Sequence, residues 1–244
     1  MEKEWFASWF DSPYYHILYK HRDDTEAKHF INTLINKLQP QPLAYMLDLA
    51  CGKGRHSRYL ASLGFCVTGI DLSTENIKFA RQFEGEHLSF YTHDMRHPFR
   101  INYYEFIFNF FTSFGYFEND KDHIDSLVNV QKGLQKGGIF VLDYLNAEKV
   151  AQTMRYKREK TVDGIHFQMR SSVEKGYITK QIHFEDKGQQ YQFEERVRAF
   201  GLEDFKQMMK TAELKIEGCY GDYSLNPYEP RQSDRLIIIA RKEL

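Results

Sequence analysis

The residues best placed to do chemistry are a glycine turn and two acids that follow it. The turn, DLACGKG at residues 48–54, lies between an apolar run and a segment of helical character. Glycines at a strand-to-helix turn let the backbone approach a ligand, and the free N–H groups of the helix N-terminus face the same place. Asp71 and Asp94 each end a later apolar run. A carboxylate at such a position can accept hydrogen bonds from both hydroxyls of a ribose, so the pattern predicts a nucleotide or nucleoside site.

Two phosphate-binding patterns compete for this turn. A P-loop requires G-x-x-x-x-G-K-[ST], but Lys53 falls between the two glycines and no such run follows Gly54. A dinucleotide turn requires G-x-G-x-x-G, and the third glycine is missing. The turn therefore satisfies neither phosphate-binding pattern, while an NAD(P)-dependent oxidoreductase stays open as a weaker alternative.

The elements that must position these residues alternate along the chain. Apolar runs predict strands at 44–49, 65–71, 88–92, 105–110 and 139–145, and the intervening segments predict helices near 54–63, 74–83 and 120–135. Strands separated by helices form right-handed βαβ units, with a parallel sheet covered on both faces. Ligands bind at the carboxyl ends of such strands, where the glycine turn, Asp71 and Asp94 all fall.

Other segments flank or interrupt this core. Residues 5–38 have helical character, with an interruption at Pro13. Residues 155–200 alternate polar and apolar positions and carry three glycine-containing turns spaced 12 residues apart, which predicts four antiparallel strands. A helix near 202–214 and strands at 215–220 and 235–241 then return to the core.

The expected antiparallel sheet has two unlike faces. Its apolar face contains Ile165, Phe167, Ile178, Ile182 and Phe184, and its polar face includes Arg170, Lys180, Gln190 and Glu194. An apolar face on so small a sheet must be covered, either by the main domain as a substrate lid or by a second chain.

The composition narrows the class of protein. The 33 basic and 34 acidic residues among 244 give a net charge of −1, which argues against a dedicated nucleic-acid binder. No apolar run reaches the ~18 residues of a membrane span, and the N-terminus has no apolar core of a signal peptide, so we expect a cytoplasmic protein. The three cysteines are not spaced as metal ligands, and no metal site is predicted.

Taken together, the motifs resemble those of the class I S-adenosylmethionine (SAM)-dependent methyltransferases. The run LDLACGKGRHS is similar to the first motif of that family, with Ala50 where the family usually has glycine. The resemblance implies SAM as cofactor and an α/β, Rossmann-like class I methyltransferase fold. That fold is a seven-stranded mixed sheet of order 3-2-1-4-5-7-6 with helices on both faces and an antiparallel β insertion after strand 5. Residues 1–154 and 201–244 would form the SAM-binding domain with an N-terminal helical cap, and residues 155–200 the insertion.

The resemblance also implies roles for individual residues. Asp71 would accept the ribose hydroxyls and Asp94 the adenine amino group, while Arg22 is a candidate partner for the methionine carboxylate. The remaining predicted cofactor-binding residues are Tyr19, Asp48, Ala50, Gly52, Gly54, Leu72, Met95, Asn109 and Phe110. Candidates for the catalytic pocket are Tyr15, Tyr116 and His123.

The segment after the fourth strand restricts the class of methyl acceptor. Nucleic-acid amino methyltransferases carry Asn/Asp-Pro-Pro-Tyr/Phe there, whereas residues 109–112 read NFFT, which disfavours methylation of adenine N6 or cytosine N4. The chain resembles small-molecule enzymes such as glycine/sarcosine and amino-sugar N-methyltransferases, which implies an amine acceptor. Methyl transfer would be an in-line displacement, and the apolar face and open edge strands of the insertion make a homodimer possible. An oxygen or carbon acceptor and a non-catalytic SAM-fold binding module remain alternatives.

Overall fold

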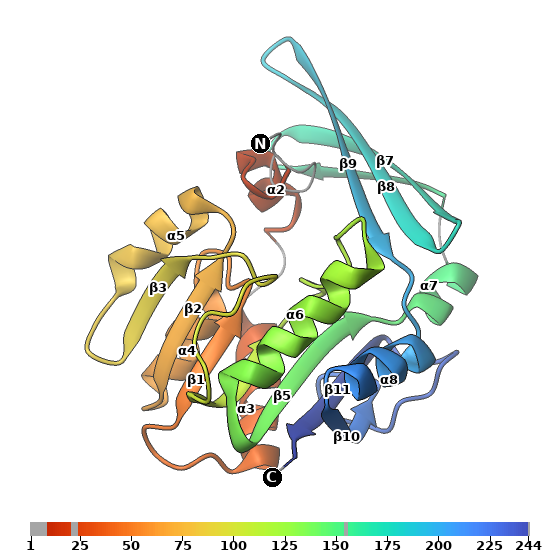
Figure 1. Cartoon of the computed structure of the whole chain (residues 1–244). Coiled ribbons are helices and arrows are strands. Elements are labelled where there is room, and N and C mark those ends of the chain that lie inside the picture. Colours follow the sequence, from red (N-terminus) through yellow and green to blue (C-terminus); the bar gives the residue numbers. More distant parts are fainter. Residues whose placement is uncertain (1–8, 21–23, 154–155, 244) are drawn as a thin grey trace.

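A seven-stranded mixed sheet forms the centre of the larger body in the computed structural model, which describes residues 9–20, 24–153 and 156–243 (Figure 1). The strands are β1 (Tyr45–Leu49), β2 (Cys66–Asp71), β3 (Leu88–Thr92), β4 (Tyr104–Asn109), β5 (Leu134–Leu145), β10 (Leu214–Tyr220) and β11 (Arg235–Lys242). Their order is β10-β11-β5-β4-β1-β2-β3, with β1 to β5 parallel and β11 antiparallel to both of its neighbours. This is the predicted order 3-2-1-4-5-7-6, which is therefore confirmed.

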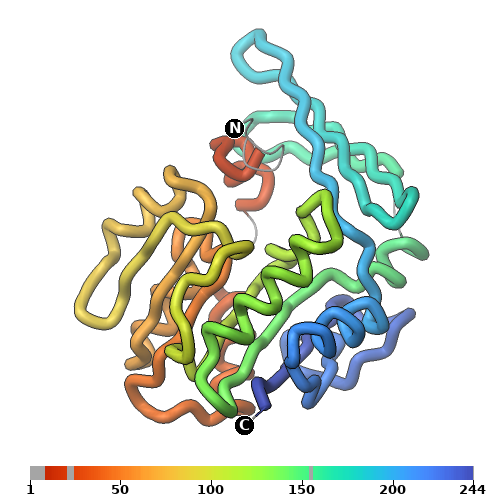
Figure 2. The backbone as a smooth tube through the Cα atoms, viewed as in Figure 1, coloured from red at the N-terminus to blue at the C-terminus, as the bar shows by residue number. Residues whose placement is uncertain are grey.

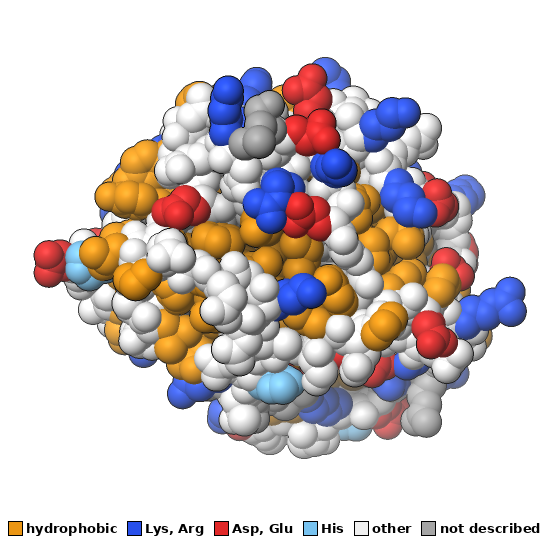
Figure 3. Space-filling view, turned by 90° about the horizontal axis from the view of Figure 1, so that it is seen from below, with side chains coloured by type: hydrophobic (Ala, Val, Ile, Leu, Met, Phe, Trp, Pro, Cys, Tyr) orange, Lys and Arg blue, Asp and Glu red, His pale blue; other side chains and the backbone are white. Residues whose placement is uncertain are grey.

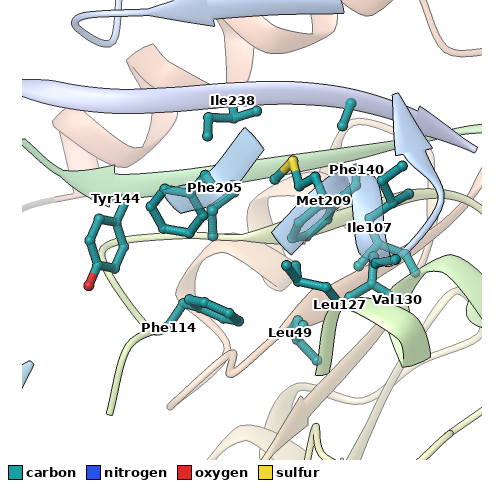
Figure 4. Packing of buried hydrophobic residues seen from close by; sticks show 14 of the residues in the cluster. Leu49, Ile107, Phe114, Leu127, Val130, Phe140, Tyr144, Phe205, Met209 and Ile238 are labelled. Atoms are coloured by element: carbon teal, nitrogen blue, oxygen red, sulfur yellow. The ribbon is translucent and has the colours of Figure 1, made fainter. Parts of the chain in front are cut away.

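Helices cover both faces of this sheet. The helices are α3 (Asp24–Leu38), α4 (Arg55–Ser62), α5 (Thr74–Ala80), η1 (Arg81–Phe83), α6 (Asp120–Gly133), α7 (Ala147–Thr153) and α8 (Leu202–Thr211). Apolar side chains of α3, α4 and α5 pack with one face of the sheet, and those of α6 and α8 pack with the other. Figure 4 shows the second of these clusters, where Leu127 and Val130 of α6 meet Phe205 and Met209 of α8 over the sheet residue Ile107. Burial on both faces explains why the parallel strands are almost continuously apolar.

The strand β5 begins earlier than predicted. The sequence predicted a helix to about residue 135 and a strand from residue 139, but α6 ends at Gly133 and β5 already begins at Leu134. The register between β4 and β5 shifts between Tyr104 and Phe106, so the strand pair contains an irregularity here. A Cβ on Gly138 would lie 2.9 Å from the carbonyl oxygen of Gln135, which is why glycine is needed at this bend.

Residues 157–198 form a separate four-stranded antiparallel sheet, as predicted. Its strands are β6 (Lys157–Val162), β7 (Ile165–Glu174), β8 (Tyr177–Asp186) and β9 (Gln189–Arg198), in the order β6-β7-β8-β9. Each tight turn has two consecutive residues with positive φ: 50° and 82° at 163–164, 51° and 78° at 175–176, and 53° and 76° at 187–188. These are the angles of the two-residue hairpin turn that matches the twist of the strands.

The short helix α2 (Pro13–Leu18) covers the apolar face of this insertion. Ser12 caps α2 and Pro13 occupies its first turn, so the proline begins a helix here. Trp9 and Leu18 join Phe167 and Ile182 in one buried cluster. The chain's own N-terminal segment therefore supplies the cover that the apolar face requires.

One side chain lies on the other face from the one predicted. Lys180 lies two positions from Ile178 and two from Ile182 on β8, so it shares their inner face and not the polar one. Its neighbour across the ladder is Glu195 of β9. A charged pair thus lies on the same face of the sheet as Ile178 and Ile182.

The insertion and α2 stand above the carboxyl ends of the parallel strands, as the backbone trace in Figure 2 shows. On the opposite side of the molecule, seen in Figure 3, acidic and basic side chains are interspersed with hydrophobic ones. Among the residues that the structure describes, no helix combines the length and apolar character needed to cross a bilayer.

Candidate active site

A cavity of about 660 Å³ lies between the carboxyl edge of the large sheet, the helix α2 and the inner face of the insertion. The predicted residues from the strand ends that line it are Ala50, Gly52, Asp71, Leu72, Asp94 and Met95. Of those predicted elsewhere, Tyr15, Tyr19 and Tyr116 also line it. Its size is that of a small-molecule site. The topology thus brings together predicted residues that lie up to 101 positions apart, from Tyr15 to Tyr116.

The two glycines of the turn have different structural roles. Gly52 has a φ of +56°, and a Cβ built on it would meet no protein atom within 4 Å, because that position opens toward the cavity it lines. Gly54 has a φ of +78°, but its Cβ would come within 2.5 Å of the Phe90 ring. Gly54 does not line the cavity, so the prediction that it contacts the cofactor is corrected: it lets the turn pack on Phe90.

Asp71 fastens the glycine turn to the end of β2. Its Oδ2 accepts a hydrogen bond from the Gly52 N–H at 2.8 Å, and its Oδ1 accepts one from the Ser73 N–H at 2.8 Å. Burial raises the pKa of this carboxyl above its usual value, against the lowering effect of these two N–H groups. Each carboxylate oxygen has a further lone pair, so Asp71 can support the turn and still accept hydrogen bonds from a ligand.

Asp48 lies beneath the turn and does not reach the cavity, which corrects its predicted role as a contact. Its side chain is buried, and the Ser57 hydroxyl donates to Oδ2 at 2.5 Å. Burial raises the pKa of Asp48 to about 6, although the hydrogen bonds of Ser57 oppose the change. Asp48 therefore joins β1 to α4 from inside the fold.

The raised pKa of Asp48 predicts a pH dependence of stability. The native protein keeps the Asp48 proton to about pH 6, whereas the unfolded chain releases it near the ordinary value of 3.8. The stability due to this group is complete below that lower value and falls by about 3 kcal/mol as the pH rises through about 6. In Asp48→Asn this contribution is absent, so urea unfolding between pH 4 and 7 should change less with pH than in the native chain. The exposed Glu86→Gln is the matched control, and an unchanged pH slope in Asp48→Asn would contradict the assignment.

Asp94 is held by its own neighbour. Its carboxylate accepts from the Arg96 backbone N–H at 2.9 Å and from the guanidinium, with Nη2 at 2.6 Å. Burial raises the pKa of Asp94, but the bonds and charge of Arg96 outweigh it and lower the pKa below the usual value. Asp94 therefore stays ionised at the cavity wall, as an acceptor of hydrogen bonds.

At the end of β4 the prediction is shifted by two residues. Asn109 and Phe110 were expected to contact the cofactor, but both are buried and neither lines the cavity. Asn109 donates from Nδ2 to the Leu49 carbonyl at 2.9 Å and so joins β4 to β1. Phe111 and Thr112, which follow, line the cavity in their place.

His123 is a core residue and the prediction that it lines the pocket is corrected. Its ring is buried among Phe114, Phe117 and Phe200, and its Nδ1 lies 3.1 Å from the Asn119 carbonyl oxygen. Burial lowers its pKa to about 4, so it is neutral at physiological pH. Arg22, the predicted partner of the methionine carboxylate, falls outside the described residues.

Comparison with known proteins gives the family. Residues 46–138 match the model of a methyltransferase domain, which spans the glycine turn, Asp71 and Asp94. The chain is 29% identical over 208 residues to YqeM of Bacillus subtilis (strain 168), which is named as a methyltransferase, with 81% of this chain and 83% of that one covered. The chain is a class I SAM-dependent methyltransferase.

The solved structures agree with the fold of this methyltransferase. A SAM-dependent methyltransferase from Clostridium acetobutylicum ATCC 824 superposes with a TM-score of 0.79 at 20% identity, over 98% of each chain. The sugar N-methyltransferase KedS8 from Streptoalloteichus sp ATCC 53650 gives a TM-score of 0.75 at 16% identity, over 94% of this chain and 93% of that one. The cofactor of the methyltransferase is SAM, and the cavity beside the glycine turn offers the residue types that a nucleoside needs.

The insertion of the methyltransferase contributes a charged pair to the cavity wall that was not predicted from the sequence. Lys180 and Glu195 form an ion pair of 2.9 Å in the cavity wall. Glu195 also accepts hydrogen bonds from Trp9 Nε1 at 2.8 Å and from the Tyr19 hydroxyl at 2.6 Å, which join the N-terminal segment to the insertion. Burial raises the pKa of Glu195, but Lys180 and Tyr19 outweigh it, so the pKa is lowered and the carboxylate stays charged. The signal was available: the turn at 187–188 fixes a register that pairs Lys180 with Glu195.

Proposed function

We propose that this methyltransferase transfers the methyl group of SAM to a small-molecule amine by in-line displacement. The observation that carries the proposal is the aromatic wall on the side of the cavity nearest α2. The ring centroid of Phe10 lies 5.1 Å from that of Tyr15 and 5.2 Å from that of Tyr116, and the ring centroids of Tyr15 and Tyr19 are 5.0 Å apart. All four side chains line the cavity. Aromatic faces attract ammonium groups, and an ammonium forms when the lone pair of a neutral amine takes the methyl group and the positive charge passes from sulfur to nitrogen.

The cofactor half of the proposed site is the edge of the large sheet. The backbone of Ala50 and Gly52 would lie against the methionine part, Asp71 would accept the ribose hydroxyls, and Asp94 with Met95 would receive the adenine. SAM supplies a methyl carbon that is already activated by the sulfonium. The chain therefore mainly has to align the acceptor and exclude water, which is what α2 and the insertion do by closing the cavity.

The acidic and basic groups of the wall favour nitrogen over oxygen as the acceptor atom. A neutral amine needs no base, whereas a hydroxyl must lose its proton to one. Glu195 already accepts hydrogen bonds from Trp9, Tyr19 and Lys180, and its pKa is lowered, so it is a poor base. Burial, helped by the charge of Lys53, also lowers the pKa of His16. The similarity in fold to KedS8, a sugar N-methyltransferase, points in the same direction.

The remaining partners belong to the same proposal. The insertion would act as a lid over a small-molecule substrate, with no nucleic acid or membrane as partner. Because α2 covers the apolar face of the insertion, a homodimer would have to use its outer face or its edge strands β6 and β9. Light scattering would report the oligomeric state.

The acceptor class is tested by incubating the protein and SAM with a panel of small amines, amino sugars among them, beside the matching alcohols. We expect S-adenosylhomocysteine to form and the methyl group to appear on nitrogen by mass spectrometry. Tyr116→Ala should raise the KM for the amine about tenfold through loss of an aromatic contact. The control Tyr156→Ala, at a side chain that is 70% exposed, should not change it. Methylation confined to the alcohols would overturn the amine assignment.

A further inference from the structure

The turn that follows β4 has an unusual backbone at the wall of the cavity. Phe111 has a φ of 57° and Thr112 a φ of 58°, so two consecutive residues with side chains adopt the left-handed conformation. This conformation brings Cβ close to the backbone, and it is rare for bulky and β-branched residues. Such strain persists only where surrounding contacts hold it, and it concentrates at functional sites. Both residues line the cavity.

Asp143 of β5 binds both strained residues. Its Oδ2 accepts a hydrogen bond from the Phe111 N–H at 2.9 Å, and its backbone carbonyl accepts one from the Thr112 N–H at 2.9 Å. The Tyr223 hydroxyl donates to the same Oδ2 at 3.2 Å. Asp143 is fully buried, so these bonds do not compete with bulk water.

Arg235 of β11 balances the buried charge and holds the side chain of the turn. Its Nε donates to Asp143 Oδ1 at 2.7 Å, and its Nη2 donates to Thr112 Oγ1 at 2.9 Å. Burial alone would lower the pKa of Arg235, but Asp143 raises it, so the guanidinium remains charged. Arg235 itself lines the cavity. The main chain of Thr112 is therefore held by the Asp143 carbonyl, and its side chain is held by Arg235, the ion-pair partner of the Asp143 carboxylate.

We propose that Asp143 is a positioning residue: with Arg235 it holds the Phe111–Thr112 turn in its left-handed conformation and so sets the shape of the cavity where the acceptor meets the methyl group. Asp143 does not itself line the cavity, so it acts through the turn. The hold on the backbone follows from the contacts above. Its effect on turnover rests on the proposed function.

A double-mutant cycle tests the hold without any knowledge of the acceptor. Asp143→Asn keeps the volume of the side chain and one acceptor oxygen, but it loses the charge that binds Arg235 and cannot serve all three donors. Thr112→Gly adopts a positive φ without strain. We expect Asp143→Asn to lower the midpoint of thermal unfolding, and Thr112→Gly to restore part of that loss in the double variant.

The matched control is Lys175→Gly, an exposed residue with a φ of 51° in the turn between β7 and β8. It should stabilise the native and Asp143→Asn backgrounds equally, because it does not contact Asp143. Equal effects of Thr112→Gly on the two backgrounds would overturn the proposed hold, whatever the acceptor is.

Turnover separates positioning from a merely structural role. With an amine identified by the panel, and at a temperature where all variants are folded, Asp143→Asn should lower kcat at least about tenfold, since a small displacement of an aligning group has an effect of that order. The KM for SAM and the affinity for S-adenosylhomocysteine should stay within about threefold, and Thr112→Gly should recover part of kcat. An unchanged kcat, or a kcat loss that Thr112→Gly does not relieve, would contradict positioning even if the cycle in stability shows coupling.

Discussion

Gly52→Val is expected to abolish binding of S-adenosylhomocysteine while the protein stays folded. The new side chain would project into the cavity, because the Cβ position of Gly52 faces open space and not protein. A branched side chain there would fill the space in which the cofactor must approach the protein backbone. Isothermal calorimetry with S-adenosylhomocysteine measures the loss, and circular dichroism reports the fold.

Gly188→Val is the matched control for this variant. Gly188 also has a positive φ, of 76°, and its Cβ would also meet nothing within 4 Å, but it lies in the turn between β8 and β9, far along the chain from the cofactor half. Both variants carry the same kind of backbone strain, of about 1–3 kcal/mol. Only Gly52→Val should lose the ligand. Retained binding in Gly52→Val would place the cofactor elsewhere.

Asp71→Ala should weaken binding of S-adenosylhomocysteine by about 1–3 kcal/mol, which corresponds to roughly 5- to 150-fold in Kd. Two effects combine in this loss. The ribose hydroxyls lose their acceptor, and the Gly52 and Ser73 N–H groups lose the carboxylate that fixes the turn. Calorimetry against the native chain gives the magnitude.

Asp222→Ala separates the ligand contact from the loss of a loop support. Asp222 also accepts from two backbone N–H groups, of Ser224 and Asn226, at 2.9 and 3.1 Å, but it does not line the cavity. It should cost stability and leave the affinity unchanged. If Asp71→Ala bound S-adenosylhomocysteine as tightly as Asp222→Ala does, the ribose assignment would fail.

Much of the fold was predictable because its signals are local. Buried strands such as β1 and β2 are apolar along their length, the helices between them have one apolar stripe, and the three tight hairpin turns carry glycine at their second residue. The observed strand ends fall within one residue of the predicted ones, except at the start of β5, whereas α5 and α8 each end three residues before the predicted helix ends. The positions of the glycine turn and of Asp71 were equally predictable, because the carboxyl ends of strands in a parallel sheet meet at one edge.

The sequence alone determined which elements form and which of their ends meet; tertiary structure decided which side chains reach the cavity. Residues 111 and 112 line the cavity in place of 109 and 110, because two residues in the left-handed conformation redirect the chain after β4. Neither of them is a glycine, so no residue type indicated this conformation in advance. Helix packing buried His123 among three phenylalanines, and the pleat of β8 turned Lys180 inward. The support of the strained turn joins Asp143 to Arg235, 92 positions away. Such pairs depend on the register between β5 and β11, and no local pattern of residues encodes a contact of that separation.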